Sequence, residues 1–400
     1  MNRITNWLIL LLIFSVPIEQ IISLPGLGTI TRVTGLIAFL VWFVNIILTK
    51  RIRRPHVFHV LAILFFVWSS LSILWTKSLP TTLERSSTYM QLAIFILIIW
   101  DGVTTLKDCR EAMQAYIFGV YVAVGSTISQ FLAGNAAKYG RYAAGDFDDN
   151  DLGIIISLGI PFAWYLVTSR DKSKSYSLFD YINIIFIPAA VCGILLTASR
   201  TAMISLFPGF LYIILSLQKL GIFQKLLVFS IGMISIISLP FFIPSETFLR
   251  LSTVSDSVSS GDLNGRADIW REGFQNYARE PFLGVGSGAF AETVESQLVA
   301  HNTFLSSLFE VGFIGFLLFI LIVTIVVYES TRFSSLWIAV FIVLFVGAMS
   351  LSWEHRKPTW LIMNLAIIHR NAEESRRQQK PQKNNLFLSP GNYFKSAPDI

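Results

Sequence analysis

The chain has 400 residues, of which 54% are hydrophobic and only 14% charged, and its mean hydropathy is +0.61. A soluble domain carries about 25% charged residues, so this composition excludes a set of soluble domains and predicts an integral membrane protein. The formal charge of +6 does not imply nucleic-acid binding, because membrane proteins collect Lys and Arg on their cytoplasmic side. Two cysteines and five scattered histidines predict neither a disulfide framework nor a metal site.

Apolar segments follow one another along the chain at the length that a membrane crossing needs. A spanning helix takes roughly 20 mostly apolar residues. The first segment has no small-residue cleavage site, so we interpret it as a membrane helix and not as a signal peptide. The last is short and could be re-entrant. The twelve candidates cover residues 4–22, 29–49, 57–75, 88–104, 111–132, 152–168, 180–198, 201–217, 226–243, 303–328, 333–351 and 358–369.

The positive charges predict the orientation. With the N-terminus in the cytoplasm, 19 of the 31 Lys and Arg residues fall on the cytoplasmic side. We therefore expect an all-α integral membrane protein with about twelve transmembrane helices, both termini inside, and a single polytopic membrane domain over 1–370. Two outer loops stand out, 133–151 and 244–302, and the second is a large extracytoplasmic loop between spans 9 and 10. The polar segment 371–400 is predicted to be a disordered cytoplasmic tail.

The first outer loop combines Arg141 with an acidic cluster, DFDDND, at 146–151. Clustered aspartates can bind Ca²⁺ or Mg²⁺. The cluster has no Gly at the sixth position and no Glu at the twelfth, so its spacing fits no EF-hand. We expect no metal site here.

Arg200 lies in TASRTA, at the outer junction of spans seven and eight. It is either an interfacial arginine or a second cation beside Arg266. Two arginines that converge outside the membrane would suit a diphosphate, because each guanidinium can pair bidentately with phosphate oxygens.

The long outer loop contains a short helix before a proline. Trp270, Phe274 and Tyr277 share one face of this helix, and Arg266 lies one turn earlier on the same face. We expect the aromatic stripe to dock onto the membrane domain or the lipid interface and to carry Arg266 inward, where a guanidinium needs an anion. The alternative is a snorkelling or capping arginine.

Three further features follow along the chain. The sequence GVGSG at 284–288 permits close backbone approach or positive φ, and it lacks the GK[ST] ending of a nucleotide loop. His301 stands at the outer entrance to the tenth span, and histidine is well suited to accept a proton near neutral pH; a structural histidine is the alternative. Glu310 lies nine residues later, on the opposite side of a regular helix, and we expect it to face the bundle interior.

Taken together and in this order, these motifs resemble the O-antigen ligase/polymerase superfamily. The match runs from roughly 140 to 320, and it departs at Glu280, where the family often has Asn or a similar small polar residue. The motifs read Gly145-Asp146-Phe147…Asn150; Ser199-Arg200-Thr201-Ala202; Gly265-Arg266…Trp270; Pro281…Gly284-Val285-Gly286…Phe290; and His301-Asn302…Leu305…Glu310-Val311-Gly312…Gly315.

The resemblance implies a membrane glycosyltransferase, an O-antigen ligase or a surface-polysaccharide polymerase. Such an enzyme moves a glycan from an undecaprenyl-diphosphate carrier to a glycan or lipid-linked acceptor, on the outer face of the cytoplasmic (inner) membrane. It implies that Arg200 and Arg266 hold the diphosphate, that His301 orients or deprotonates the acceptor hydroxyl, and that no metal, other cofactor or nucleic acid takes part. The resemblance and the motifs also mark candidate substrate-binding residues, namely Arg141, Asn150, Trp270, Gly284, Gly286, Asn302 and Glu310.

Two alternatives remain, a protein of another class and a different enzyme within the glycosyltransferase class. A polysaccharide or lipid-linked-glycan transporter or flippase would need no transferase chemistry. Major-facilitator transporters have two similar halves joined by a central cytoplasmic loop, whereas the longest loop here is predicted outside and no internal repeat is present. A peptidoglycan-type polymerase would share the large outer loop, but those enzymes typically rely on a loop aspartate, whereas this loop leads into His301.

Overall fold

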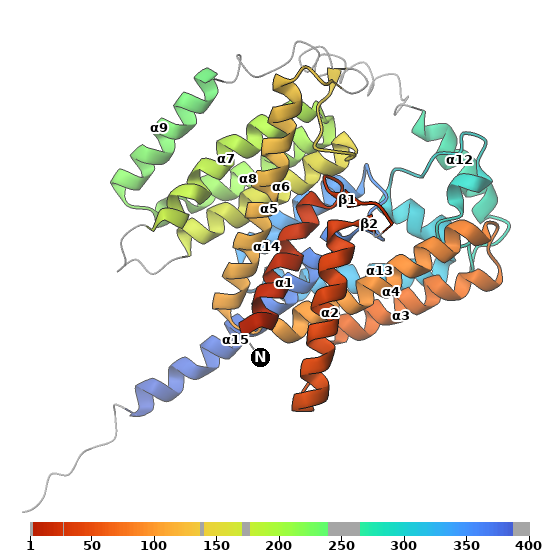
Figure 1. Cartoon of the computed structure of the whole chain (residues 1–400), viewed down its shortest axis with the longest axis horizontal. Helices are drawn as coiled ribbons and strands as arrows, with labels where there is room; N and C mark the ends of the chain where they lie inside the picture. The colour runs from red at the N-terminus through yellow and green to blue at the C-terminus, as the bar shows by residue number, and fades with distance from the viewer. Residues whose placement is uncertain (1–2, 27, 137–139, 170–176, 239–264, 387–400) are drawn as a thin grey trace, which may run out of the picture.

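The computed structural model describes residues 3–26, 28–136, 140–169, 177–238 and 265–386. In these ranges the chain is mainly helical, with one small antiparallel pair of strands, Ser23–Leu24 (β1) and Gly28–Thr29 (β2). The helices, drawn in Figure 1, are α1 (Arg3–Ser15), α2 (Ile30–Thr49), α3 (Val57–Leu71), α4 (Leu79–Gly102), α5 (Leu106–Leu132), α6 (Asp149–Thr168), α7 (Leu178–Thr197), α8 (Arg200–Ser216), α9 (Ile222–Ser238), α12 (Arg266–Tyr277), α13 (Thr303–Thr331), α14 (Ser335–Ala348) and α15 (Lys357–Leu386).

Within the described ranges, seven helical segments are long and apolar enough to cross a membrane. They are α2, α3 with its 3-10 extension to Leu74, α5, α6, α7, α8 with its extension to Lys219, and α13. A helix also overlaps each of the other predicted segments, but those in α1, α9 and α14 are shorter. The expected all-α membrane fold agrees with this architecture. The number twelve and the position of the long loop, part of which lies outside the described residues, stay predictions.

Helix α6 forms the centre of the membrane domain. Nearly every residue from Asp151 to Val167 is buried, because α5, α7, α8 and α14 pack around it. Large apolar side chains on the outer helices are exposed instead, including Leu48 on α2, Phe207 on α8 and Phe229 on α9. These exposed faces are the ones that lipid would cover. Figure 1 shows α9 at the edge of the bundle, beside α7.

Segments predicted on the same side of the membrane lie together. At the predicted outer end, the Lys357 ammonium, at the start of α15, pairs with Glu19 after α1 at 2.9 Å. At the predicted inner end, the Arg53 amide donates to the Asp101 carboxylate at the end of α4, at 2.7 Å. The connections predicted to lie outside and those predicted to lie inside are therefore at opposite ends of the helices.

Two helices differ from the predicted segments. Helix α4 begins nine residues early, at Leu79, because a proline in the first turn is compatible with a helix. Helix α15 is one continuous helix of 30 residues that includes the last predicted segment, and its crossing of the membrane stays a prediction. The same helix continues over 371–386, which the sequence predicts to be part of a disordered tail. Arg370 pairs there with Glu374 at 2.9 Å, and this i, i+4 spacing supports helices. The rest of the predicted tail lies outside the described residues.

Candidate active site

Four helices begin near one another at the predicted outer end. Arg200 is the first residue of α8 and Arg266 the first of α12, while His301 directly precedes Asn302, the N-cap of α13. Asp148 caps α6. Arg266 interacts electrostatically with Arg200 and Asp148, and His301 interacts with Arg266 and Asp148. The structure thus brings the three predicted catalytic residues into one cluster, which we call the arginine–histidine cluster.

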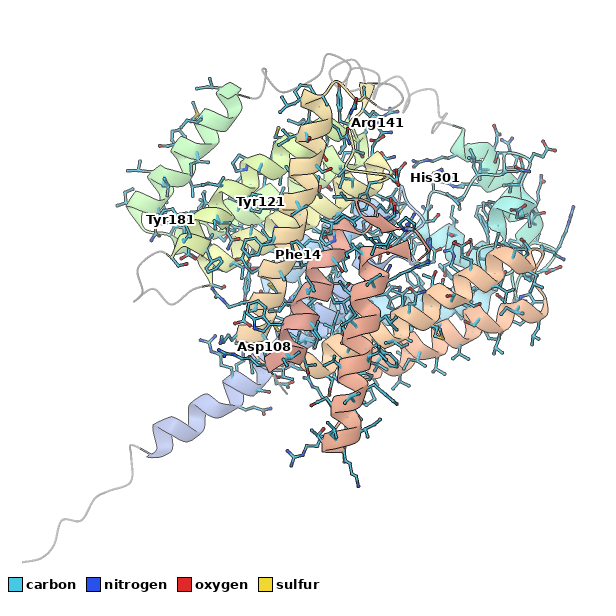
Figure 2. All side chains as sticks on the ribbon, viewed as in Figure 1. Phe14, Asp108, Tyr121, Arg141, Tyr181 and His301 are labelled. Atoms are coloured by element: carbon cyan, nitrogen blue, oxygen red, sulfur yellow. The ribbon has the colours of Figure 1, made fainter. Side chains whose placement is uncertain are left out.

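Figure 2 places this cluster within the molecule. His301 and Arg141 lie toward the upper side of the view, and Asp108, at the start of α5, lies toward the lower side. The cluster therefore sits at the end opposite to the connections predicted to be cytoplasmic.

A residue with a left-handed backbone conformation lies at or just before each of the three predicted catalytic residues. The φ angle is 47° at Ala198, two residues before Arg200, 75° at Gly265 and 49° at His301 itself. Positive φ is uncommon for residues other than glycine, and such residues persist where surrounding structure holds them and often mark functional sites. Ser199 secures the first turn, since its hydroxyl accepts from the Ala202 amide at 3.3 Å.

The electrostatics of the cluster favour an anion. Burial and the neighbouring charge of Arg200 lower the pKa of Arg266. Burial and the charge of Arg266 lower the pKa of His301, against an opposing effect of Asp148, so the imidazole is uncharged at neutral pH. Helix N-termini add partial positive charge and free amides. An anionic ligand would relieve the repulsion between the two arginines.

The aromatic stripe of α12 docks onto α13 of the membrane domain, one of the two surfaces that its spacing predicts. The Phe274 ring meets Phe309 edge-on, with centroids 5.1 Å apart. The Trp270 indole donates to the Ala300 carbonyl at 2.8 Å, so it holds the residue next to His301. Trp270 therefore positions the cluster; its role in substrate binding stays a prediction.

The loop 133–151 braces the start of α8. The Arg141 guanidinium donates to the Thr197 carbonyl at 2.9 Å and to the Asn150 side chain at 3.0 Å, and it pairs with Asp149 at 2.9 Å. Asn150 also accepts from the Ser199 hydroxyl at 2.9 Å. These bonds fix the turn that presents Arg200, and direct substrate contact by Arg141 or Asn150 stays a prediction. Among the described residues, no group of three or more acidic, histidine or cysteine side chains is arranged to hold a metal ion.

The glycine-rich loop 284–288 supports a break in α13. Gly312 leaves the helical conformation, with φ 66° and ψ −174°. The amides of Val285 and Gly286 donate to the carbonyls of Phe309 and Glu310 at 3.0 and 2.9 Å. A broken helix at membrane depth is tolerated where other protein groups satisfy its backbone, and this loop satisfies it.

Close approach explains the glycines of this loop. A Cβ on Gly284, whose φ is 69°, would lie 2.6 Å from the Glu310 carbonyl oxygen and from the Gly312 nitrogen. The Glu310 carboxylate is buried and accepts from the Gly288 amide at 2.7 Å. Glu310 thus faces the interior, as expected. The substrate-binding roles predicted for Gly284, Gly286, Glu310 and the capping residue Asn302 stay predictions.

Residues 184–320 match a family model described as O-antigen ligase. The chain resembles the O-antigen ligase superfamily. The part of the chain that matches the O-antigen ligase model contains Arg200, Arg266 and His301, whereas Arg141 and Asn150 precede it. No curated protein matches the sequence closely enough to count as a relative.

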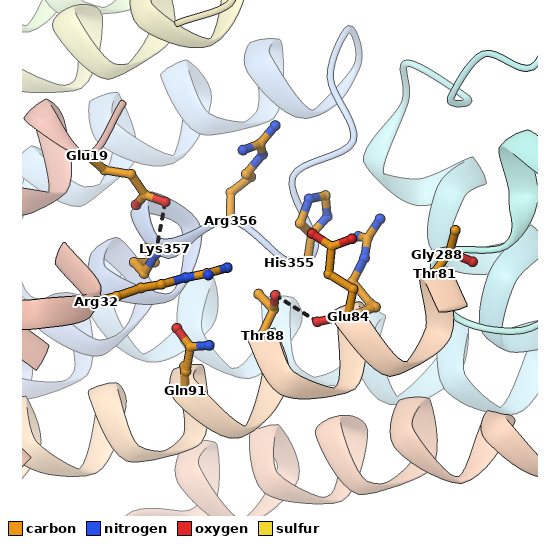
Figure 3. A pocket seen from close by; sticks show the side chains of 11 residues that line it. Glu19, Arg32, Thr81, Glu84, Thr88, Gln91, Gly288, His355, Arg356 and Lys357 are labelled. Atoms are coloured by element: carbon orange, nitrogen blue, oxygen red, sulfur yellow. Dashed lines mark hydrogen bonds and ion pairs between the residues drawn. The ribbon is translucent and has the colours of Figure 1, made fainter. Parts of the chain in front are cut away.

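A second polar group lies almost wholly outside the O-antigen ligase match, and the sequence analysis missed it. A cavity of about 340 Å³ opens at the same end of the molecule (Figure 3), and its lining includes Arg32, Glu84, Gln91, His355, Arg356 and Lys357. We call it the outer cavity. One sequence signal pointed to it: the run WEHRK at 353–357 places a charged cluster in a short outer turn, against the positive-inside rule.

Proposed function

We propose that this chain is a glycosyltransferase of the O-antigen ligase type, which moves a glycan from an undecaprenyl-diphosphate carrier to an acceptor hydroxyl on the outer face of the cytoplasmic membrane. The observation that carries the proposal is the convergence of Arg200, Arg266 and His301 at the starts of α8, α12 and α13. Two guanidiniums beside helix N-termini suit a diphosphate, because both supply N–H donors and positive charge.

The proposed reaction is a single displacement. The acceptor oxygen forms a bond to the anomeric carbon, and the bond from that carbon to the phosphate oxygen breaks. The carrier diphosphate leaves with the electron pair, and Arg200 and Arg266 stabilise the added charge. The hydroxyl proton passes to His301, whose lowered pKa keeps the imidazole ready to accept it.

The chemistry separates this proposal from a flippase. A flippase needs the diphosphate site but no proton acceptor, whereas a transferase needs both. The purified protein in lipid vesicles, supplied with a labelled carrier-linked glycan and an acceptor, should form the transferred product without a nucleotide sugar. Carrier movement across the vesicle without product would replace the transferase by the flippase.

Arginine-to-lysine variants test the diphosphate role. Lysine keeps the charge but loses the planar fork, so Arg200→Lys and Arg266→Lys should each lower turnover by about 10- to 100-fold, the range of a charged hydrogen bond. The matched control is Arg271→Lys, because Arg271 lies on the same helix but is exposed and paired with Asp268. Wild-type turnover in both site variants, at equal folded amounts, would remove the arginines from the proposal.

A further inference from the structure

The outer cavity lies between the starts of α2, α4 and α15. Arg32 enters it from α2, Glu84 and Gln91 from α4, and His355 from the turn before α15. Figure 3 shows the Arg32 and Arg356 side chains on one side of the space and His355 on the other. Its described lining consists of charged, hydroxyl, amide and imidazole side chains and one glycine. A ligand here would therefore be bound by hydrogen bonds and not by apolar contact.

A buried carboxylate fixes the His355 ring. The Nδ1 atom lies 3.0 Å from Oε1 of Glu354, which is 1% exposed and also accepts from Arg85 at 3.0 Å. Since the carboxylate only accepts, Nδ1 carries the proton, and Nε2 is left as an acceptor. Among the described residues none hydrogen-bonds Nε2. Burial and the charge of Arg85 lower the pKa of His355 to about 3, so the ring stays neutral.

Three of the four cations that line the outer cavity, all except Arg32, are already balanced by fixed carboxylates. Lys357 pairs with Glu19 at 2.9 Å, and Arg356 pairs with Asp151 at 3.3 Å. Arg85 pairs with Glu354 in the same way. A phosphate would gain little from cations that are already neutralised, and it would meet the carboxylates that line the space.

The remaining groups offer donors and acceptors side by side. Arg32 supplies N–H donors, Glu84 supplies carboxylate acceptors, and Gln91 supplies both. A divalent cation would meet the guanidinium of Arg32. Sugar hydroxyls both donate and accept, so a polyol is the ligand that satisfies every kind of group present.

We infer that the outer cavity is a saccharide-binding subsite, which holds one neutral sugar ring whose hydroxyls donate to His355 Nε2 and Glu84 and accept from Arg32. That this ring belongs to the reacting glycan, on either the acceptor or the donor, rests on the proposed function. The binding itself does not.

Short bonded segments join the outer cavity to the arginine–histidine cluster. Thr303, two residues after His301, donates to the Leu351 carbonyl at 2.7 Å and accepts from the Trp353 amide at 2.9 Å. The Trp353 indole donates to Asp151 at 2.8 Å. The turn that carries His355 is therefore fixed to the start of α13, so a sugar held here would lie beside the proposed transfer site.

Binding of simple sugars tests the inference without any transfer reaction. The full chain in lipid nanodiscs would be titrated with neutral hexose and N-acetylhexosamine disaccharides, using saturation-transfer NMR. His355→Asn keeps a donor near the Nδ1 position for Glu354 but has no atom at Nε2. Glu84→Gln removes a charged acceptor from an exposed side chain, and Glu292→Gln, exposed in the outer loop and outside the cavity lining, is the control.

We expect each cavity variant to weaken sugar binding about tenfold or more, because each loses an acceptor, and the control to bind like the wild type. Excess inorganic phosphate should not displace the sugar. No binding of either disaccharide, unchanged binding in both cavity variants, or displacement by phosphate would overturn the subsite. Unchanged Glu84→Gln binding would by itself count against Glu84 even if His355→Asn folds poorly.

Kinetics distinguish the two sources of the sugar. If the ring belongs to the acceptor, Glu84→Gln should raise the KM for the acceptor tenfold and leave the KM for the carrier-linked donor unchanged; if it belongs to the donor, the pattern reverses. Transfer with an unchanged KM for both substrates would contradict the saccharide-binding subsite but not the proposed function. Sugar binding without transfer would contradict the proposed function but not the saccharide-binding subsite.

Discussion

His301 and His355 lie at the same end of the molecule, in polar regions that balance charge in different ways. Around His355, the charge of Arg85 is balanced within hydrogen-bond distance by the buried carboxylate of Glu354. Around His301, the nearby guanidinium of Arg266 is itself repelled by Arg200. In the first region three of the four cations are paired with carboxylates, whereas in the second Arg266 and Arg200 repel each other and Asp148 offsets part of their charge. Recognition of a neutral sugar suits the first, and development of negative charge suits the second.

Helix N-termini and ion pairs together make the same distinction. Helices α6, α8, α12 and α13 all begin at the arginine–histidine cluster, so their amide ends add positive potential there. The outer cavity also lies between the starts of α2, α4 and α15, but its cations Arg85, Arg356 and Lys357 are paired with carboxylates. A change of chemistry should therefore follow mutation in the cluster, and a change of affinity should follow mutation in the cavity.

The largest expected effect is that of His301→Ala. Positioned acid–base groups contribute roughly 10²–10⁴-fold to rate, so turnover should fall by that factor while the carrier-linked donor still binds. Turnover and donor binding would be measured on the same purified sample. Wild-type turnover, or a loss traced wholly to unfolded protein, would make His301 a structural residue and remove the contrast with His355.

The next largest effect is expected from Gly312→Ala, which tests the kink in α13 that is bonded to loop 284–288. The φ of 66° and the closeness of the Phe282 carbonyl leave no room for a Cβ, and such strain costs about 1–3 kcal/mol. The free energy of unfolding should fall by that amount in denaturant titrations. Gly125→Ala is the control, because its Cβ would meet nothing within 4 Å and alanine is the better helix former. Equal stability of the two variants would contradict the role assigned to the kink.

A smaller effect is expected from pH. His301 accepts a proton only when unprotonated, and its pKa lies below 6.5. Turnover should therefore stay level down to about pH 6.5 and fall about tenfold per unit once the pH drops below the pKa of His301. Asp148→Asn keeps a good helix cap but removes a charge that raises this pKa, so the acid limb should move to lower pH. A limb that stays in place would show that another group titrates.

Much of the arginine–histidine cluster could be predicted from the sequence, because its signals are local. Helix periodicity placed Trp270 and Phe274 on one face, and the structure has both on one helix that begins at Arg266. Three short motifs named Arg200, Arg266 and His301 before any contact was known.

The outer cavity could not be predicted in the same way, because its residues come from distant segments with no shared pattern. Arg32, Glu84 and His355 meet only when α2, α4 and α15 pack. A search for apolar segments also missed the first turns of α4, because these turns are polar. The role of loop 284–288 could not be predicted for a related reason. The sequence shows its glycines, but the loop amides bind backbone carbonyls of α13, which are left without helical partners only because of the kink at Gly312.

The smallest expected effect separates positioning from chemistry within the cluster. Trp270→Phe keeps the ring that packs on α13 but removes the indole N–H that donates to the Ala300 carbonyl. A neutral hydrogen bond contributes about 1 kcal/mol, so turnover should fall about fivefold through a less well-held His301, with little change in donor KM. Trp75→Phe is the matched control, because its indole donates to the Leu283 carbonyl in the neighbouring outer loop, away from residue 300. If the two variants lose turnover equally, the effect belongs to the stability of the outer segments and not to the orientation of His301.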